Sequence, residues 1–274
     1  MNPNTKTIIL LSVLTFILVV LGFFISGWTG ALIFLTFSLF IDIISYWFSD
    51  KIALYSAKAK EIYEQEAHDI FADLKELSAK FSIPTPKLYI SPSQQANAFA
   101  TGRDLGHSTI CLTEGILKQL NRDQIRAVMA HELSHIRSHD VLIGTVAALL
   151  SSSIASIAQF GGLLNSEEEE NNPIVSLLLI IFAPIAALLL QLAISRQREF
   201  SADNASARIT GRPRDLADAL LNIESSAENF PMSVNPGFAS LYVINPLHLK
   251  GVMGLFSTHP STEERVRRLY ALQA

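Results

Sequence analysis

Four long apolar runs constrain the fold of this chain more than any other feature of its sequence. The runs comprise residues 8–28, 29–48, 141–164 and 174–194. A helix of about 20 apolar residues is long enough to cross the roughly 30 Å of hydrocarbon in a bilayer. Each run therefore predicts a membrane span, and the short connections predict two transmembrane hairpins, the first of which turns near Gly27 and Trp28.

The overall composition agrees with insertion into a membrane, so a lipid bilayer is an expected partner. Of the 274 residues, 49% are hydrophobic and 17% are charged, which is too apolar for an ordinary soluble protein. A net charge of -4 without a basic stripe predicts no nucleic-acid partner. The single cysteine, Cys111, rules out an intramolecular disulfide and is typical of a small hydrophobic residue in a strand.

Two details of the first hairpin have alternative interpretations. The first run could be a cleaved signal peptide, but a second span follows at once and Lys6 is its only basic flank. Asp42 lies within the second run, where a charged residue is often functional. It is also close to the polar end of the run, so solvation or a hydrogen bond between helices explains it equally well.

The spans divide the chain into regions of alternating polarity, namely 1–50, 51–140, 141–194 and 195–274. Basic residues flank one set of span ends: Lys6, Lys51, Lys58, Lys60, Arg137, Arg196 and Arg198. The turns at 27–30 and 163–173 contain neither Lys nor Arg. The positive-inside rule therefore predicts a multi-pass plasma-membrane protein whose two polar regions and both termini are cytoplasmic.

The polar regions predict a mainly helical domain with a small β-sheet. The predicted strands are 87–91, 97–101 and 108–113, and the predicted helices are an amphipathic one ending at Phe81, then 122–139, 195–208, 215–226 and a short one after Ser261. Asn121 with Gln124 and Ser261 with Glu264 have the spacing of capping boxes. The fold class expected is a mainly α membrane protein with four transmembrane helices in two hairpins and an α+β domain.

The predicted helix 122–139 contains the pattern H-E-x-x-H at residues 131–135. Two histidines four residues apart project from one helical face, so both imidazoles can bind a single metal ion, with Glu132 beside the open coordination position. The pattern predicts a zinc hydrolase. The alternative, in which His131 and His135 are surface or packing residues, is disfavoured by the helical context.

A catalytic zinc ion usually has three protein ligands, so the two histidines need a partner. Glu199 is the best candidate because it lies on a helix that emerges from the same membrane face. Asp203 is one turn further on and can accept a hydrogen bond from a ligand histidine. His139 is a rival ligand, but it lies about 12 Å along the helix axis from His131, too far to share a tetrahedral ion on a straight helix.

Four segments together resemble the HtpX family of membrane zinc endopeptidases, which belong to the gluzincins and are related to the CAAX prenyl endopeptidases. These segments are residues 97–102, 131–140, 199–203 and 257–262. The resemblance covers nearly the whole chain. It implies a gluzincin-type catalytic domain between and after the two hairpins.

The resemblance also implies residue roles. It implies that one Zn²⁺ ion per chain is bound by His131, His135 and Glu199, that Glu132 is the catalytic base and that Asp203 orients a ligand. The strand formed by Asn97, Ala98, Phe99 and Ala100 would border the substrate. His259 and Arg265 match positions near the catalytic centre, where they would stabilise the oxyanion.

The expected function is zinc-dependent hydrolysis of peptide bonds in misfolded or damaged membrane proteins at the cytoplasmic face, as part of quality control and the stress response. One alternative is the processing of prenylated CAAX-type C-termini. Another is a non-proteolytic membrane chaperone with a structural metal. The short connection from Gly102 to Ser108 provides no extra substrate loop, and no pattern in the sequence specifies an oligomeric state.

Overall fold

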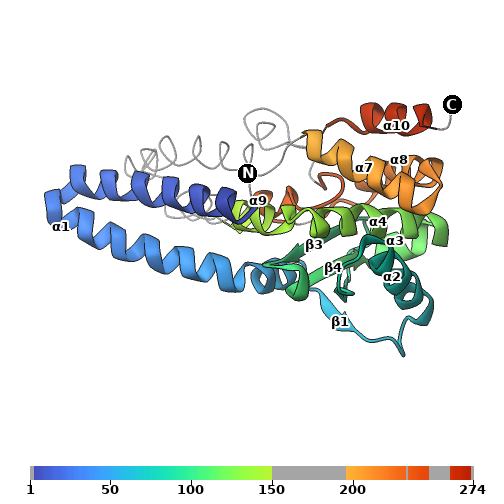
Figure 1. Ribbon diagram of the computed structural model, residues 1–274, viewed down its shortest axis with the longest axis horizontal. Helices are drawn as coiled ribbons and strands as arrows, with labels where there is room; N and C mark the ends of the chain where they lie inside the picture. Colours follow the sequence, from blue (N-terminus) through green and yellow to red (C-terminus); the bar gives the residue numbers. More distant parts are fainter. Residues whose placement is uncertain (1–2, 150–195, 233, 247–259, 273–274) are drawn as a thin grey trace, which may run out of the picture.

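A computed structural model of the chain describes residues 3–149, 196–232, 234–246 and 260–272. It shows a long helical hairpin that projects from a domain made of a four-stranded sheet and several helices (Figure 1). Most of the predicted third span, the whole of the fourth span, the acidic loop between them and His259 lie outside the described residues.

The hairpin is formed by α1 (Pro3–Ser56), which is interrupted where the sequence predicts a turn. The backbone leaves the helical region at Ser26 and at Gly27, whose φ of 57° favours glycine. The two arms approach closely, since a Cβ on Gly22 would lie 2.5 Å from the carbonyl oxygen of Gly30. Glycine at both positions therefore permits the tight packing of the arms.

One helix among the described residues, Ser26–Ile44, is long and apolar enough to cross a membrane, and it coincides with much of the second predicted span. The arrangement of four spans therefore stays a prediction. Between the two arms, the Thr15 hydroxyl donates a hydrogen bond of 2.9 Å to the Asp42 carboxylate. This is the helix–helix hydrogen bond that was one of the two interpretations of Asp42.

The sheet has the strand order β1-β2-β4-β3. Its strands are β1 (Lys60–Ile62), β2 (Lys87–Ser91), β3 (Ala98–Gly102) and β4 (Ser108–Thr113). The β2–β4 pair is parallel and the other two pairs are antiparallel, so β3 is an edge strand. The structure has β2 and β4 at their predicted positions and β3 one residue later, whereas β1 was not predicted.

Helices cover the sheet and enclose the core. They are α2 (His68–Phe81), α3 (Glu114–Gln119), α4 (Arg122–Arg137), α7 (Arg196–Thr210), α8 (Pro213–Asn229), α9 (Pro236–Ala239) and α10 (Thr262–Ala271), with a short 3₁₀ turn η1 (Leu105–His107). The central helix α4 lies between the sheet and the α7–α8 pair (Figure 1). Val128 and Leu133 of α4, Leu112 of β4 and Leu220 of α8 are fully buried in this core.

The structure corrects the predicted extent of α4. The helix ends at Arg137 and not at residue 139, because His139 has a φ of 55°, in the left-handed region. A new helical segment, Asp140–Leu149, begins directly afterwards. The predicted helix 122–139 is therefore two residues too long, and the turn at His139 separates the metal motif from the segment that begins the predicted third span.

Candidate active site

The metal motif is held on α4 by the surrounding protein. The helix starts with a complete capping box, in which the Asn121 side chain accepts from the Gln124 backbone and the Gln124 side chain accepts from the Asn121 backbone. Its packing between the sheet and α7 leaves His131 and Glu132 only 1% and 3% exposed. The side chains of the motif are therefore fixed inside the protein and not on a solvated helix face.

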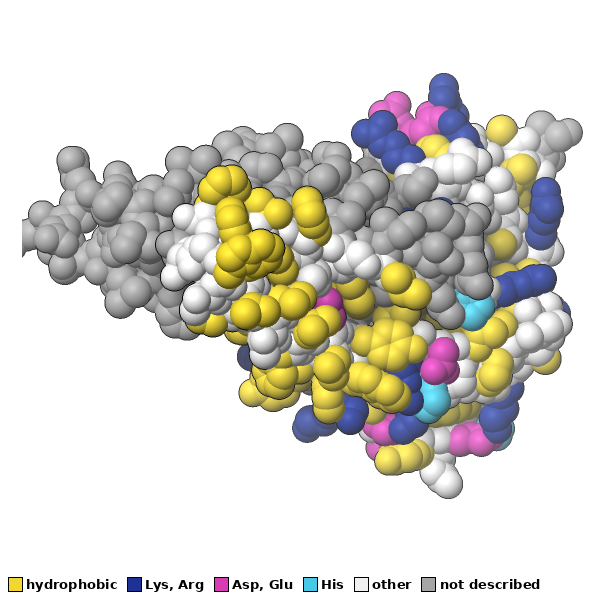
Figure 2. Space-filling model, turned by 60° about the vertical axis from the view of Figure 1, so that its left-hand side comes forward, with side chains coloured by type: hydrophobic (Ala, Val, Ile, Leu, Met, Phe, Trp, Pro, Cys, Tyr) yellow, Lys and Arg dark blue, Asp and Glu magenta, His cyan; other side chains and the backbone are white. Residues whose placement is uncertain are grey.

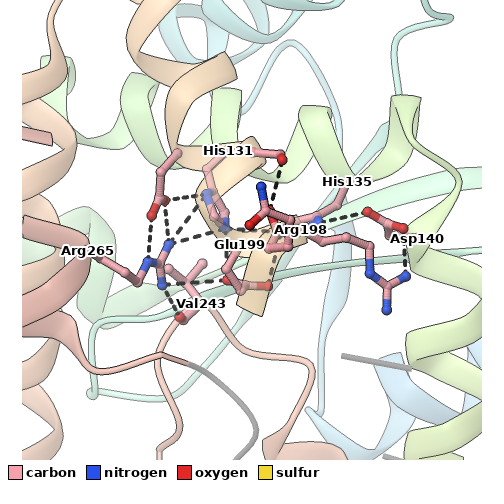
Figure 3. A network of polar contacts seen from close by, with 10 residues as sticks. His131, His135, Asp140, Arg198, Glu199, Val243 and Arg265 are labelled. Carbon is pink, nitrogen blue, oxygen red and sulfur yellow. Dashed lines mark hydrogen bonds and ion pairs between the residues drawn. The ribbon is translucent and has the colours of Figure 1, made fainter. Parts of the chain in front are cut away.

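Three side chains converge where the sequence predicts the metal ligands (Figure 3). The Nε2 atoms of His131 and His135 are 3.2 Å apart, and the Glu199 carboxylate oxygens lie 3.7 Å and 3.5 Å from these two atoms. Ligands bound tetrahedrally to zinc at about 2.0–2.1 Å are separated by about 3.3 Å. Two imidazoles and one carboxylate with this spacing fit a catalytic zinc ion and leave a fourth position open.

Each histidine has a carboxylate on the ring nitrogen that faces away from this centre. His131 Nδ1 is 3.0 Å from Asp203, and His135 Nδ1 is 3.6 Å from Asp140. Such partners fix the orientation of a ligand imidazole and leave Nε2 to bind the metal. Asp203 lies where the sequence predicts it. The role of Asp140 was missed, because only the turn at His139 brings it back toward His135.

Asp203 is itself held by Arg265, which reaches it from α10. The guanidinium donates to both carboxylate oxygens, at 2.9 Å and 2.7 Å, and to the Val243 carbonyl at 2.9 Å. Burial alone would raise the pKa of Asp203, but Arg265 and the hydrogen bond with His131 outweigh it and hold the pKa at about 2. Asp203 is therefore a permanent carboxylate partner of His131.

Arg265 lies near the catalytic centre, as predicted, but its contacts are not those expected of an oxyanion donor. Its side chain is 1% exposed, lies behind His131 and does not line the cavity at the site. Its donors are directed at Asp203, Val243 and, at 3.7 Å, Glu199. This arrangement supports a positioning role and not direct contact with a substrate oxyanion.

Glu132 lies beside the ligand group and has the environment of a general base. Burial, together with the nearby Glu199, raises the pKa of Glu132 to about 7, although His135 and Arg265 oppose the shift. The backbone N–H of Ala100 donates to its carboxylate. A carboxyl group that titrates near neutral pH can both take up and return a proton during a reaction.

The pKa of His135 is also raised, to about 9. Burial lowers it, but Glu199, Asp140 and Glu132 together outweigh the burial. Three carboxyl groups around one imidazole favour positive charge at this position. Such an environment attracts a divalent cation.

A cavity of about 60 Å³ opens onto these groups. Its lining residues are Ala100, His131, Glu132, His135, Asp140, Val141, Gly144, Arg198, Glu199, Ser240, Leu241, Tyr242 and Val243. The segment 240–243 forms one wall, which no sequence signal indicated. The cavity thus combines the polar ligand group with an apolar wall, as substrate sites commonly do.

Only one of the four predicted substrate-binding residues lines this cavity. Ala100 does so, whereas the Asn97 amide donates to the Ile244 carbonyl at 2.8 Å and thereby holds the 243–244 backbone. The Phe99 ring packs against Tyr242 with centroids 5.0 Å apart. Ala98 is fully buried in the core. Asn97 and Phe99 therefore support the wall of the cavity from behind.

The outer edge of β3 faces the cavity at one end. The Asn97 carbonyl accepts from Thr113 N–H of β4, so by alternation the backbone groups of Ala98 and Ala100 point away from β4. The Ala98 carbonyl accepts from Val243 N–H at 2.9 Å, which occupies one end of this edge. The other end, at Ala100, borders the cavity, and there the Ala100 N–H donates to Glu132.

His139, the rival third ligand, does not join the group of three; it occupies the turn after α4. Among the described residues, His131, His135 and Glu199 form the group that could hold a metal ion.

Comparisons with known proteins agree with this geometry. Residues 64–273 match the family described as peptidase family M48. The chain is 43% identical over 277 residues to a protease HtpX homolog of Pelotomaculum thermopropionicum, with 98% of this chain and 99% of that protein covered. It is 42% identical over 272 residues to a protease HtpX homolog of Thermococcus kodakarensis, with 96% and 94% covered.

The fold is also similar to that in the crystal structure of S. mikatae Ste24p. The TM-score is 0.53 with 18% sequence identity, and the match covers 94% of this chain. It covers 62% of the other chain, so this protein spans less than two thirds of that structure. At this identity the likeness concerns the fold alone.

Proposed function

The chain belongs to peptidase family M48 and is a membrane metalloprotease, and on this premise we propose that it is a zinc-dependent endopeptidase for misfolded or damaged membrane proteins. The proteolysis would take place at the cytoplasmic face, as part of membrane protein quality control under stress. The observation that carries the proposal is the convergence of His131, His135 and Glu199 beside the buried Glu132.

In this proposal His131, His135 and Glu199 hold one zinc ion. When bound, such an ion acts as a Lewis acid toward the scissile carbonyl and makes water more acidic. Glu132 would take a proton from the attacking water at its carboxylate and return it to the nitrogen of the leaving amine. Asp203 and Asp140 keep the two imidazoles oriented, and Arg265 keeps Asp203 in place.

The substrate would lie in an extended conformation along the end of β3 that borders the cavity, next to Ala100. Hydrogen bonds to a strand edge are made by backbone groups and read little sequence. This favours broad cleavage of unfolded segments. His259 remains the proposed donor to the oxyanion.

The proposed topology places both hairpins in the plasma membrane and both polar regions in the cytoplasm. The candidate span Ser26–Ile44 supports one crossing. Lys51, Lys58 and Lys60 follow that crossing closely, which supports a cytoplasmic position for the sheet.

The test is a protease assay combined with metal analysis on the detergent-purified protein. We expect cleavage of an unfolded protein such as casein to be abolished by a zinc chelator and by Glu132→Gln, while that variant retains its zinc. Glu224→Gln on the exposed face of α8 is the matched control and should behave as the unaltered protein. Undiminished proteolysis by Glu132→Gln would contradict the proposal.

A second assay compares plain peptides with the same peptides carrying a C-terminal prenyl group. The quality-control proposal predicts cleavage of both. Cleavage restricted to the prenylated peptides would show that the CAAX-processing alternative is correct.

A further inference from the structure

The two tryptophans of the chain mark the ends of the candidate membrane span. Trp28 lies in the first turn of Ser26–Ile44, Trp47 lies three residues beyond its end, and the two side chains are 79% and 51% exposed. Trp47 lies 19 positions after Trp28 on the same helical arm, a rise of about 28 Å, which matches the roughly 30 Å thickness of the hydrocarbon core. Because tryptophan concentrates at the two lipid–water interfaces, each ring indicates the level of one interface.

Other aromatic side chains gather at the Trp47 end of the span. Tyr46 and Phe48 are 38% and 46% exposed, and the Lys51 ammonium group lies over the Phe48 ring. Figure 2 shows hydrophobic side chains covering this face of the hairpin and charged side chains farther away on the domain. A belt of aromatic and cationic side chains at the end of an apolar helix is typical of the headgroup layer.

The catalytic domain contacts this belt through the turn that follows β3. The Arg103 guanidinium lies 4.9 Å from the centre of the Trp47 ring, a cation–π contact between the turn and α1. The Arg103 side chain is 23% exposed and also forms an ion pair with Asp104, at 3.5 Å. The end of β3 is therefore at the same level as the aromatic belt.

The strand that carries Arg103 also borders the cavity. Ala100 lines the cavity and precedes Arg103 by three residues. Three residues of extended chain span at most about 10 Å. The edge of the cleft is therefore within about 10 Å of the residue that contacts Trp47.

We infer that Trp47 and Arg103 form a contact surface for the lipid–water interface that holds the catalytic cleft within about 10 Å of the headgroup layer. The inference rests on the proposed function and specifies its substrate class. The preferred substrates are peptide segments that directly adjoin a membrane span. A cytoplasmic segment far from any membrane span is a poorer substrate, because its peptide bonds are seldom within about 10 Å of the headgroup layer.

A series of anchored substrates tests the inference in lipid nanodiscs. Two substrates carry the same cleavable sequence, joined to a transmembrane anchor by a linker of about 4 or about 24 residues. With the shorter linker fully extended, the scissile bond lies at most roughly 13 Å from the membrane. Effective concentration falls with about the −3/2 power of linker length, which predicts roughly tenfold faster cleavage of the nearer bond. Equal rates, or faster cleavage of the farther bond, would overturn the inference.

Substitution of Arg103 tests the contact itself. Arg103→Gln removes the cation from the Trp47 ring, and we expect the tenfold preference for the nearer bond to diminish while casein is cleaved at the unaltered rate. Arg214→Gln, on an exposed arginine of α8, is the control and should keep the preference. An unchanged preference in Arg103→Gln would refute the role of the contact. If the unaltered protein did not cleave casein, this result would refute the proposed function and not the contact.

The height of Trp47 can be measured without any activity. In Trp28→Phe, Trp47 is the sole tryptophan, and its fluorescence can be quenched by lipids brominated at shallow or deep positions of the acyl chain. We expect the shallow bromines to quench more strongly. Stronger quenching by deep bromines, or none by either lipid, would overturn the inference.

Discussion

The buried pair formed by Arg265 and Asp203 gives the sharpest prediction about this site. Both side chains are almost inaccessible, at 1% and 3% exposure, and two hydrogen bonds join them. Replacing Arg265 by Met leaves the Asp203 carboxylate charged in the interior without its partner. Removing one member of a buried pair costs about 3–5 kcal/mol, so the free energy of unfolding should fall by that amount.

The double variant Asp203→Leu with Arg265→Met separates stability from metal binding. It removes both buried charges, and such replacements by apolar residues are often neutral for stability. It also leaves His131 Nδ1 without its carboxylate, and loss of such a partner lowers metal affinity about 10- to 100-fold. We therefore expect the double variant to recover stability but not zinc affinity.

The assays are urea unfolding in detergent and zinc competition against a chromophoric chelator. The matched control is the exposed pair of Arg212 and Asp123, whose side chains are 60% and 53% exposed at 2.5 Å separation. Breaking it should cost at most about 1 kcal/mol. A loss that small in Arg265→Met, or full zinc affinity in the double variant, would refute the reasoning.

Three further predictions concern other described residues. Asp140→Ala should weaken zinc binding about 10- to 100-fold in the same competition assay, because His135 loses its Nδ1 partner; unaltered affinity would show that the 3.6 Å contact has no such role. Gly144→Leu should lower kcat/KM for peptides with bulky side chains and Gly144→Ala should not, because a Cβ there meets Leu241 only at 3.8 Å and leaves room for one methyl group. Burial raises the pKa of Cys111, so mass spectrometry should detect no alkylation at about pH 8 until the protein is unfolded; modification of the native protein would contradict the buried placement.

The parts of the fold that the sequence predicted well depend on local signals. The capping residues Asn121 and Ser261 begin α4 and α10 as expected, since the side chain and the backbone group that it caps are only three residues apart. The strand β2 alternates in polarity, and β4 has an apolar centre, Ile110 to Leu112, between hydroxyl residues. The three-residue strand β1 has no such signal, because it depends on pairing with β2.

The metal ligands could be predicted, but the groups that hold them could not. The four-residue spacing of His131 and His135 predicts that both side chains lie on one face of a helix. The contact of Asp140 with His135 depends on a left-handed turn at His139, which a non-glycine residue rarely adopts and no pattern indicates. The sequence predicts Arg265 near the catalytic centre. Its pairing with Asp203 could not be predicted, because it depends on how α10 packs against the rest of the domain.

The two ligand histidines are thereby connected to different parts of the molecule. His131 is oriented through Asp203 by Arg265 of the C-terminal helix. His135 is oriented by Asp140, the first residue of a helical segment whose Leu142 and Val146 pack against Leu18 of the hairpin.

These connections differ in what can disturb them. The orientation of His131 depends on contacts within the catalytic domain, whereas that of His135 depends also on how the segment after α4 sits against the hairpin. Asp140 is the carboxylate partner that adjoins the hairpin contact, although Arg198 of α7 also holds it, at 2.7 Å. The geometry of the metal site therefore depends on the hairpin chiefly through one ligand, His135, so the membrane segments contribute to the catalytic centre as well as to its anchoring.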